Sequence, residues 1–204
     1  CKFAWGDKIY NEKKDVIANA QAISGSGSLR LLAQFLKNCN IVGQVNFPNP
    51  TWTNQHTIFR NAGLATGDYT YLDSKAPVLN FKGMLDDISK APDHSCFMFH
   101  ACAHNPTGVD PSHEQWDELS ELCKKKNHVV LFDAAYLGYC SGDVANDAYS
   151  FRKFVSDGHN VALTLSFSKN FGLYGERAGI VSVVTANPKE RENTIEQLKI
   201  GARC

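Results

Sequence analysis

Short apolar runs alternate with segments of helical periodicity along most of this 204-residue chain. The runs of strand length lie at residues 41–47, 96–102, 129–132, 161–165 and 178–184. Helical spacing of apolar residues follows residue 28 and Pro111, and a further helix is predicted around 149–155. Strands that alternate with helices form a parallel sheet, because each connecting helix packs against a face of it. The sequence therefore predicts one α/β domain, a mainly parallel sheet flanked by helices.

Charged residues are balanced, with 21 basic and 21 acidic side chains and no long block of one sign. This pattern argues against nucleic acid or an anionic membrane as a partner, and the apolar runs are too short to cross a bilayer. The seven cysteines include no Cys-x-x-Cys pair, which argues against a disulfide framework and against a zinc site. We therefore expect reduced thiols, no metal and a small-molecule ligand. The expected location is cytoplasmic, with a mitochondrial location left open.

Polar residues stand at the ends of three predicted strands: Asn105, Asp133 and Lys169. Ligands of parallel sheets bind beyond the carboxyl ends of the strands, so these side chains mark a candidate site. A Gly/Ser loop at 24–28 precedes a helix whose free N–H groups attract an anion. This loop has neither a Walker lysine nor a G-x-G-x-x-G pattern, which disfavours a nucleotide. Each residue alone has an ordinary structural explanation, and their order along the chain gives the interpretation its weight.

Four segments together resemble a known family. Residues 166–179, SFSKNFGLYGERAG, resemble the S-x-[SA]-K-x-x-G-L-x-G-x-R-x-G signature of class I aminotransferases, which are fold-type I enzymes dependent on pyridoxal 5'-phosphate (PLP). The segments QAISGSG at 21–27, HACAHNPTGVDP at 100–111 and FDAAYLG at 132–138 agree with the same family in the same order. The segment HACAHNPTGVDP is typical of aspartate aminotransferases. The resemblance extends from about Ile17 to Ile200.

The resemblance implies a catalytic role for Lys169, which would form a Schiff base with PLP and move a proton between substrate and cofactor. Asp133 would pair with the protonated pyridine nitrogen and keep the ring an electron sink. The cofactor phosphate would be bound by the N-terminus of the helix that follows the Gly/Ser loop, together with two side chains nearer the signature lysine. The expected phosphate ligands are Ser24, Gly25, Ser26, Ser166 and Arg177.

The remaining implied contacts are with the cofactor ring. Tyr136 and Asn105 would hydrogen-bond the phenolic oxygen, and Trp52 would stack on the ring face. Trp52 and Asn105 are also expected to contact the substrate.

The sequence departs from the family pattern at Gln55. Three residues after the stacking tryptophan the family usually has a histidine that braces the ring-nitrogen aspartate, whereas this chain has Gln55 followed by His56. Either side chain could brace Asp133, and both alternatives stay open at this point. His100 and His104 also flank the site, and we expect them to be structural histidines rather than proton carriers.

The resemblance implies an aspartate aminotransferase, which transfers the amino group of L-aspartate to 2-oxoglutarate and gives oxaloacetate and L-glutamate, working as a homodimer with shared active sites. An aromatic or broad-specificity aminotransferase is a second possibility. A cofactor-binding fragment without turnover is a third, because the arginines with which the family binds substrate carboxylates are not matched.

The domain prediction covers the whole chain. Residues 1–204 are expected to be an incomplete PLP-binding large domain without the N-terminal arm and the C-terminal small domain. A dropped segment is expected between residues 200 and 201, because Gly201-Ala202-Arg203 resembles a family segment that lies farther downstream. For this reason Arg203 is not expected to bind substrate.

Overall fold

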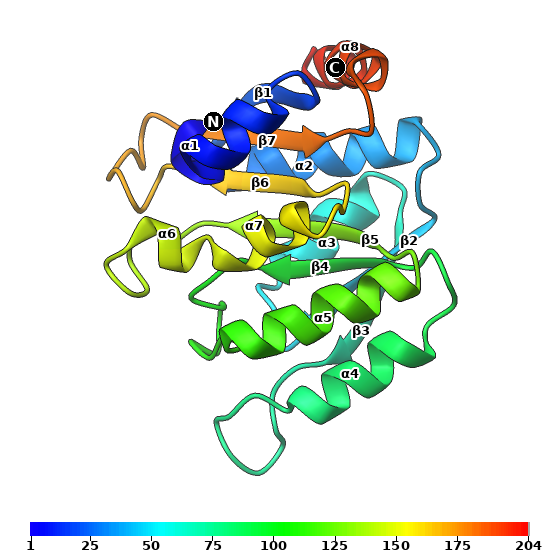
Figure 1. The fold of residues 1–204 in the computed structure, drawn as a ribbon, viewed down its shortest axis with the longest axis vertical. Helices are drawn as coiled ribbons and strands as arrows, with labels where there is room; N and C mark the ends of the chain where they lie inside the picture. Colours follow the sequence, from blue (N-terminus) through cyan, green and yellow to red (C-terminus); the bar gives the residue numbers. More distant parts are fainter. Residues whose placement is uncertain (204) are drawn as a thin grey trace.

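One seven-stranded sheet organises residues 1–203, which the computed structural model describes (Figure 1). The strands lie in the order β1-β7-β6-β5-β4-β2-β3. Their bounds are β1 Ile17–Ile23, β2 Gln44–Asn49, β3 Ala65–Thr70, β4 Cys96–His100, β5 Val129–Ala134, β6 Ala162–Ser166 and β7 Ala178–Val184. Every pairing is parallel except the two made by β7, which runs antiparallel to β1 and to β6. The predicted mainly parallel sheet is therefore confirmed.

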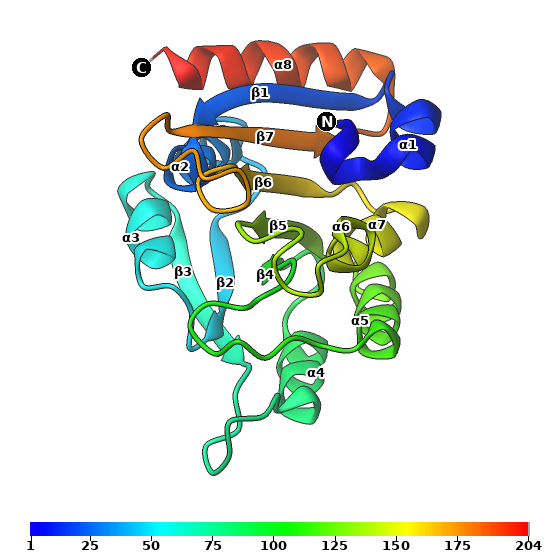
Figure 2. The same cartoon turned by 90° about the vertical axis from the view of Figure 1, so that its left-hand side faces the viewer.

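Helices cover both faces of the sheet, as Figure 2 shows in side view. On one face lie α1 (Lys2–Lys13), α4 (Phe81–Lys90), α5 (His113–Lys125), α6 (Val144–Asp147) and α7 (Tyr149–Ser156). On the other lie α2 (Ser24–Asn38) and α3 (Asn54–Asn61). Helix α8 (Pro188–Ala202) lies alongside the edge strand β1 and contacts α2. Among these described helices, none is long and apolar enough to span a membrane.

The central strands are apolar on both faces because each face carries its own core. Phe99 and Phe132 belong to the core under α5 and α7, whereas Met98 and Leu131, one residue earlier on the same strands, belong to the core under α2 and α3. This alternation follows from the two-residue period of a strand. Strands buried in this way read as continuous apolar runs, and this is why the sequence reveals them.

Several element boundaries differ from the sequence prediction; for example, the strand predicted at 129–132 extends to Ala134. The Gly/Ser stretch is the first turn of α2 rather than a loop, since the helix begins at Ser24. The second strand lies at Gln44–Asn49 instead of 41–47; it includes Pro48, which the strand accommodates because β2 pairs with β4 only at Asn46.

The fourth strand stops at His100 instead of continuing to Cys102. The chain turns there because Ala103 adopts a left-handed φ of 47° and Asp110 accepts the backbone N–H groups of Ala103 and His104 at 2.6 and 2.9 Å. The helix expected after Pro111 is α5, and it begins with a capping box in which Ser112 and Gln115 each accept the other's backbone N–H. At the far end, α8 is continuous through Ile200 and Gly201, and the dropped segment expected there stays a prediction.

The reversed strand β7 determines where the chemically important loop lies. The carboxyl ends of β1, β4, β5 and β6 all meet at one edge of the sheet, because these four strands run in the same direction. The chain leaves β6 at this edge and returns through β7 from the same edge, so the whole loop from 167 to 177 stays beside the strand ends. This edge carries the candidate site.

Candidate cofactor site

All ten residues predicted from the sequence line one cavity at the carboxyl edge of the sheet. They are Ser24, Gly25, Ser26, Trp52, Asn105, Asp133, Tyr136, Ser166, Lys169 and Arg177. They arrive from the start of α2, the loop before α3 and the ends of β4, β5 and β6, as well as from the start of β7. Distant parts of the chain therefore converge as the strand-end argument requires.

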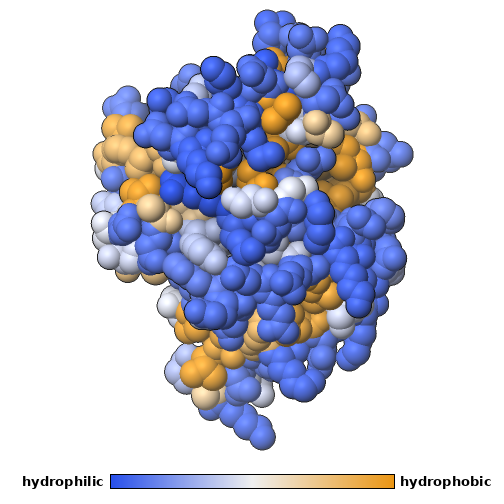
Figure 3. Space-filling model, in the orientation of Figure 1, coloured by the Kyte–Doolittle hydropathy of each residue, from blue (hydrophilic) through white to orange (hydrophobic). Residues whose placement is uncertain are grey.

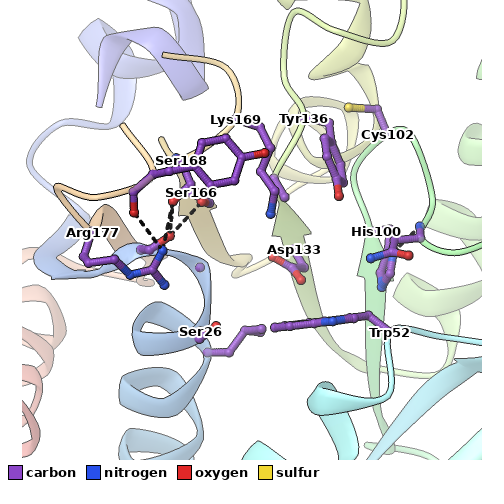
Figure 4. A pocket seen from close by; sticks show the side chains of 16 residues that line it. Ser26, Trp52, His100, Cys102, Asp133, Tyr136, Ser166, Ser168, Lys169 and Arg177 are labelled. Carbon is purple, nitrogen blue, oxygen red and sulfur yellow. Dashed lines mark hydrogen bonds between the residues drawn. The ribbon is translucent and has the colours of Figure 1, made fainter. Parts of the chain in front are cut away.

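One end of the cavity is a cluster of hydroxyl groups beside a guanidinium. Ser24 Oγ lies 3.0 Å from Ser166 Oγ and 2.5 Å from Ser168 Oγ, and Arg177 donates to Ser168 Oγ at 3.4 Å (Figure 4). The N-terminus of α2 opens onto the same space without a side-chain cap and without an acidic residue in its first turn. Uncapped N–H groups, hydroxyls and a guanidinium together form a site for an anion such as a phosphate.

The backbone around this cluster is strained and closely packed. Ser24 and Arg177 both adopt left-handed conformations, with φ of 57° and 51°, and the Ser24 N–H donates to the Arg177 carbonyl at 2.9 Å. A Cβ at Gly179 would lie 2.6 Å from the Ser24 carbonyl oxygen. Only glycine allows β7 to approach the start of α2 this closely, so Gly179 brings Arg177 to the hydroxyl cluster.

The other end of the cavity has Asp133 at its floor. His100, Asp133 and Thr164 occupy paired positions on β4, β5 and β6 and so form a polar row on one face of the sheet. Thr164 donates to Asp133 Oδ1 at 3.1 Å. Burial raises the pKa of Asp133 to about 6, although hydrogen bonds from Gln55 and Thr164 and the charge of Lys169 oppose the rise. A carboxylate in this setting favours a cationic or N–H partner within the cavity.

The partner of Asp133 from α3 is Gln55. The fully buried Gln55 side chain donates from Nε2 to Asp133 Oδ2 at 2.8 Å. His56 points elsewhere, since its Nε2 lies 3.1 Å from Asp68 Oδ1 and its ring packs against Phe47. Of the two alternatives that the sequence leaves open, the structure therefore selects Gln55.

Lys169 and two aromatic side chains enclose the space above Asp133. Figure 4 shows Lys169 and Tyr136 pointing toward Asp133 from one side and Trp52 lying across the opposite side. The Lys169 Nζ atom is 5.3 Å from the Tyr136 ring centre and 5.9 Å from that of Tyr174. Burial, then Tyr174 and Asp133, raise the pKa of the Tyr136 hydroxyl, which therefore stays a proton donor at neutral pH. The indole and the lysine amine thus line opposite sides of the same cavity.

The loop that carries Lys169 is held from outside the cavity. Tyr139 donates its hydroxyl to the Lys169 carbonyl at 3.1 Å. On the outer side, Phe3 of α1 packs against Phe167 and Phe171, with ring centres 6.2 and 5.2 Å away. These aromatic contacts flank Lys169 two residues on either side.

Sequence reasoning missed several residues of the site, among them Tyr174, Ser168 and Thr164. Ser168 lies beside Lys169 in the quoted signature, and its spacing of two from Ser166 was a signal that both hydroxyls face the same space. Thr164 had no local signal, because its contact with Asp133 depends on the register of β5 against β6. Within residues 1–203, no group of three metal-ligating side chains is gathered in one place.

Known proteins resemble this chain over nearly all of its length. The family described as aminotransferase class I and II matches residues 3–203. The mitochondrial aspartate aminotransferase of Dictyostelium discoideum is 47% identical over 199 residues, which are 98% of this chain and 47% of that protein. The cytoplasmic aspartate aminotransferase of the same organism is 41% identical over 204 residues, which are 100% of this chain and 46% of that protein.

A solved aminotransferase structure also matches this chain over nearly all of its length. The aromatic-amino-acid aminotransferase from Burkholderia pseudomallei, covalently bound to pyridoxal phosphate, matches with a TM-score of 0.94 at 36% identity, and the match covers 99% of this chain and 50% of that one. The chain thus spans about half the length of the relatives it matches. It belongs to the class I and II aminotransferases, whose fold-type I sheet it shares. Within that family it is close to the aspartate aminotransferases.

Proposed function

We propose that this chain binds PLP covalently through Lys169 and supplies the cofactor site of an aspartate aminotransferase. The observation that carries the proposal is the convergence of all ten predicted residues on one cavity, with an anion site at one end and a buried carboxylate at the other. The distribution of donors and acceptors matches a planar pyridine that carries a phosphate.

At the phosphate end, the proposed ligands are the Arg177 guanidinium, the hydroxyls of Ser24, Ser166 and Ser168, and the N–H groups at Gly25 and Ser26. The three hydroxyls now bond one another, and each can rotate to donate to a phosphate oxygen instead. The positive end of the α2 dipole adds to the attraction. This end binds and orients the cofactor without taking part in the reaction.

At the ring end, Asp133 would accept a hydrogen bond from the protonated pyridine nitrogen, and Trp52 would cover one ring face. Tyr136 and Asn105 would donate to the phenolic oxygen. When bound, PLP supplies an electron sink for the charge that develops at the substrate carbon. Asp133 maintains that sink by keeping the ring nitrogen protonated.

Lys169 would have two roles. Its Nζ would hold the cofactor, and as a free amine it would move a proton to and from the substrate Cα. The Tyr136 and Tyr174 rings beside Nζ and the Tyr139 contact to the Lys169 carbonyl limit the positions that the amine can reach.

For the substrates we propose L-aspartate and 2-oxoglutarate, with Trp52 and Asn105 contacting the substrate as well as the cofactor. The names and identities of the two Dictyostelium relatives support this choice. The aromatic alternative is supported by the fold of the Burkholderia enzyme, which matches this chain with a TM-score of 0.94. Turnover of aspartate and of phenylalanine by the complete protein separates them, and a preference for phenylalanine would contradict the aspartate assignment.

We also propose that the protein works as a homodimer. The loop after Lys169 exposes apolar side chains beside the cavity, with Phe171 55% and Tyr174 59% exposed, and Tyr139 is 63% exposed nearby. Figure 3 shows apolar surface at the left edge of the molecule, where this loop lies. An apolar surface of this kind is typical of an interface. Sedimentation of the complete protein tests the proposal, and a fully active monomer would contradict it.

The domain and location assignments stay proposals as well. A single sheet over residues 1–203 and the half-length match to relatives support a cofactor-binding large domain. For the location we propose the cytoplasm. A mitochondrial location is equally supported, since the similar relatives include a mitochondrial and a cytoplasmic aspartate aminotransferase. Microscopy of the complete protein in its native cell decides between the two compartments.

The experiment for the cofactor compares Lys169→Ala with Lys125→Ala, a control at an exposed lysine of α5. After incubation with PLP and removal of the excess, the unchanged protein and the control should keep a visible absorption band. The Lys169→Ala protein should lose it on dialysis. A Lys169→Ala protein that keeps the band as firmly as the control would contradict the proposed attachment.

A further inference from the structure

The Gln55 amide could present either its NH₂ group or its oxygen to Asp133. Its Nε2 donates to Asp133 Oδ2 at 2.8 Å. If the amide were rotated by half a turn, Oε1 would face the carboxylate oxygen, and two acceptors would meet in a buried site. The contacts of Oε1 therefore decide whether Asp133 is braced or repelled.

Two donors hold Oε1 on the side away from Asp133. The Thr51 hydroxyl donates to it at 2.6 Å, and His100 Nε2 lies 3.1 Å from it and 3.2 Å from Thr51 Oγ1. A rotated amide would leave its NH₂ group facing the Thr51 hydroxyl and the His100 N–H. The present orientation is thus favoured at both ends of the amide.

The direction of the His100 contact is set by the loop of Asn105. The Asn105 backbone N–H donates to His100 Nδ1 at 3.2 Å, so Nδ1 carries no proton and the neutral ring has its proton on Nε2. Burial, and then His104, lower the pKa of His100 well below its usual value, so the ring remains neutral. The hydrogen bonds therefore run in one direction, from the Asn105 N–H through His100 and Gln55 to the Asp133 carboxylate.

We propose that Gln55 is a positioning residue for Asp133, and that Thr51 and His100 hold its amide in the one orientation that donates to the carboxylate. The proposal rests on the proposed binding of the cofactor ring at Asp133. It assigns to an uncharged amide in this chain the place where the family pattern has a titratable histidine. A second lone pair on each Asp133 oxygen stays free for the ring nitrogen.

A matched pair of variants at Thr51 tests the proposal. Thr51→Val removes the hydroxyl at nearly constant volume, whereas Thr51→Ser retains it. With the protein loaded with PLP, we expect the Val variant to release the cofactor about fivefold faster, the equivalent of one neutral hydrogen bond. Its visible band should also titrate at a different pH from that of the unchanged protein. The Ser variant should match the unchanged protein in both measurements.

Gln55→Met provides a second variant, because its side chain has a similar length but no N–H group that could donate to Asp133. It should release the cofactor faster than Thr51→Val does. The proposal is overturned if Thr51→Val and Thr51→Ser behave alike, or if Gln55→Met retains the cofactor as the unchanged protein does. Failure of the unchanged protein to link PLP to Lys169 would instead refute the proposed function, so the two failures are distinguishable.

Discussion

Replacing Asp133 by Asn should stabilise the cofactor-free protein while it abolishes firm binding of PLP. Burial raises the pKa of this carboxyl from 3.8 to about 6, so the folded protein holds the proton more tightly than the unfolded chain does. Ionised Asp133 therefore destabilises the fold at neutral pH. A shift of about 2 units corresponds to at most about 3 kcal/mol, and water in the open cavity reduces this figure.

The Asn side chain fits the same contacts. Its Oδ1 can accept from Gln55 Nε2, and its amide group can donate to Thr164 Oγ1, which then directs its own hydrogen to the Phe132 carbonyl at 3.3 Å. Gln55 Nε2 and Thr164 Oγ1 thus each keep a hydrogen-bond partner. The comparison with the unchanged protein therefore measures the buried charge rather than a broken hydrogen bond.

The sign of the pH dependence follows from the raised pKa. In the unchanged protein Asp133 does not lower the free energy of unfolding below about pH 4, but it lowers it as the pH rises through about 6. The Asn variant has no such decrease at this position. Denaturant unfolding of both cofactor-free proteins should show the variant more stable by about 1 to 3 kcal/mol at pH 8, with the difference shrinking toward pH 4. A difference that is independent of pH would refute the reasoning.

The remaining predictions concern the walls of the cavity. Gly179→Ala should destabilise the protein by at least about 2 kcal/mol in denaturant unfolding, because its Cβ would meet the Ser24 carbonyl at 2.6 Å. A variant of unchanged stability would contradict this close approach. Ser168→Ala should weaken PLP binding by roughly tenfold in a fluorescence titration, since a hydrogen bond to a charged group is lost, and unchanged affinity would exclude the hydroxyl from the phosphate site. Phe3→Ala should shift the pH at which the visible band of bound PLP titrates, because the Phe167 and Phe171 rings lose their neighbour. Ile9→Ala, in the same helix but away from that loop, should leave the band unshifted; equal shifts in both variants would mean that α1 acts through stability alone.

The sequence predicts the cavity well because its residues follow strands buried on both faces. Asp133 and Ser166 each lie in the last two residues of such a strand, and parallel strands bring their carboxyl ends to one edge. Family resemblance then distinguishes Lys169 and Arg177 from ordinary loop residues. The reversal of β7, which returns Arg177 to the same edge, depends on pairing across the sheet and has no local signal.

The finer contacts depend on register and on the direction of side chains. Thr164 meets Asp133 only because β5 and β6 pair at that residue. The choice of Gln55 over His56 depends on which face of α3 turns toward the sheet, and the short helix does not reveal this in its sequence. The N-terminal helix α1 gave no clear signal, since Gly6 interrupts it with a φ of 73°.

The central claim is that Lys169 is the residue that binds PLP. Borohydride reduction of the PLP-loaded protein, followed by proteolysis and mass spectrometry, tests it most directly because reduction makes the linkage permanent. We expect the mass of the reduced cofactor on the peptide that contains Lys169 and on no other lysine peptide. The same mass on a different lysine, with the Lys169 peptide unmodified, would contradict the account.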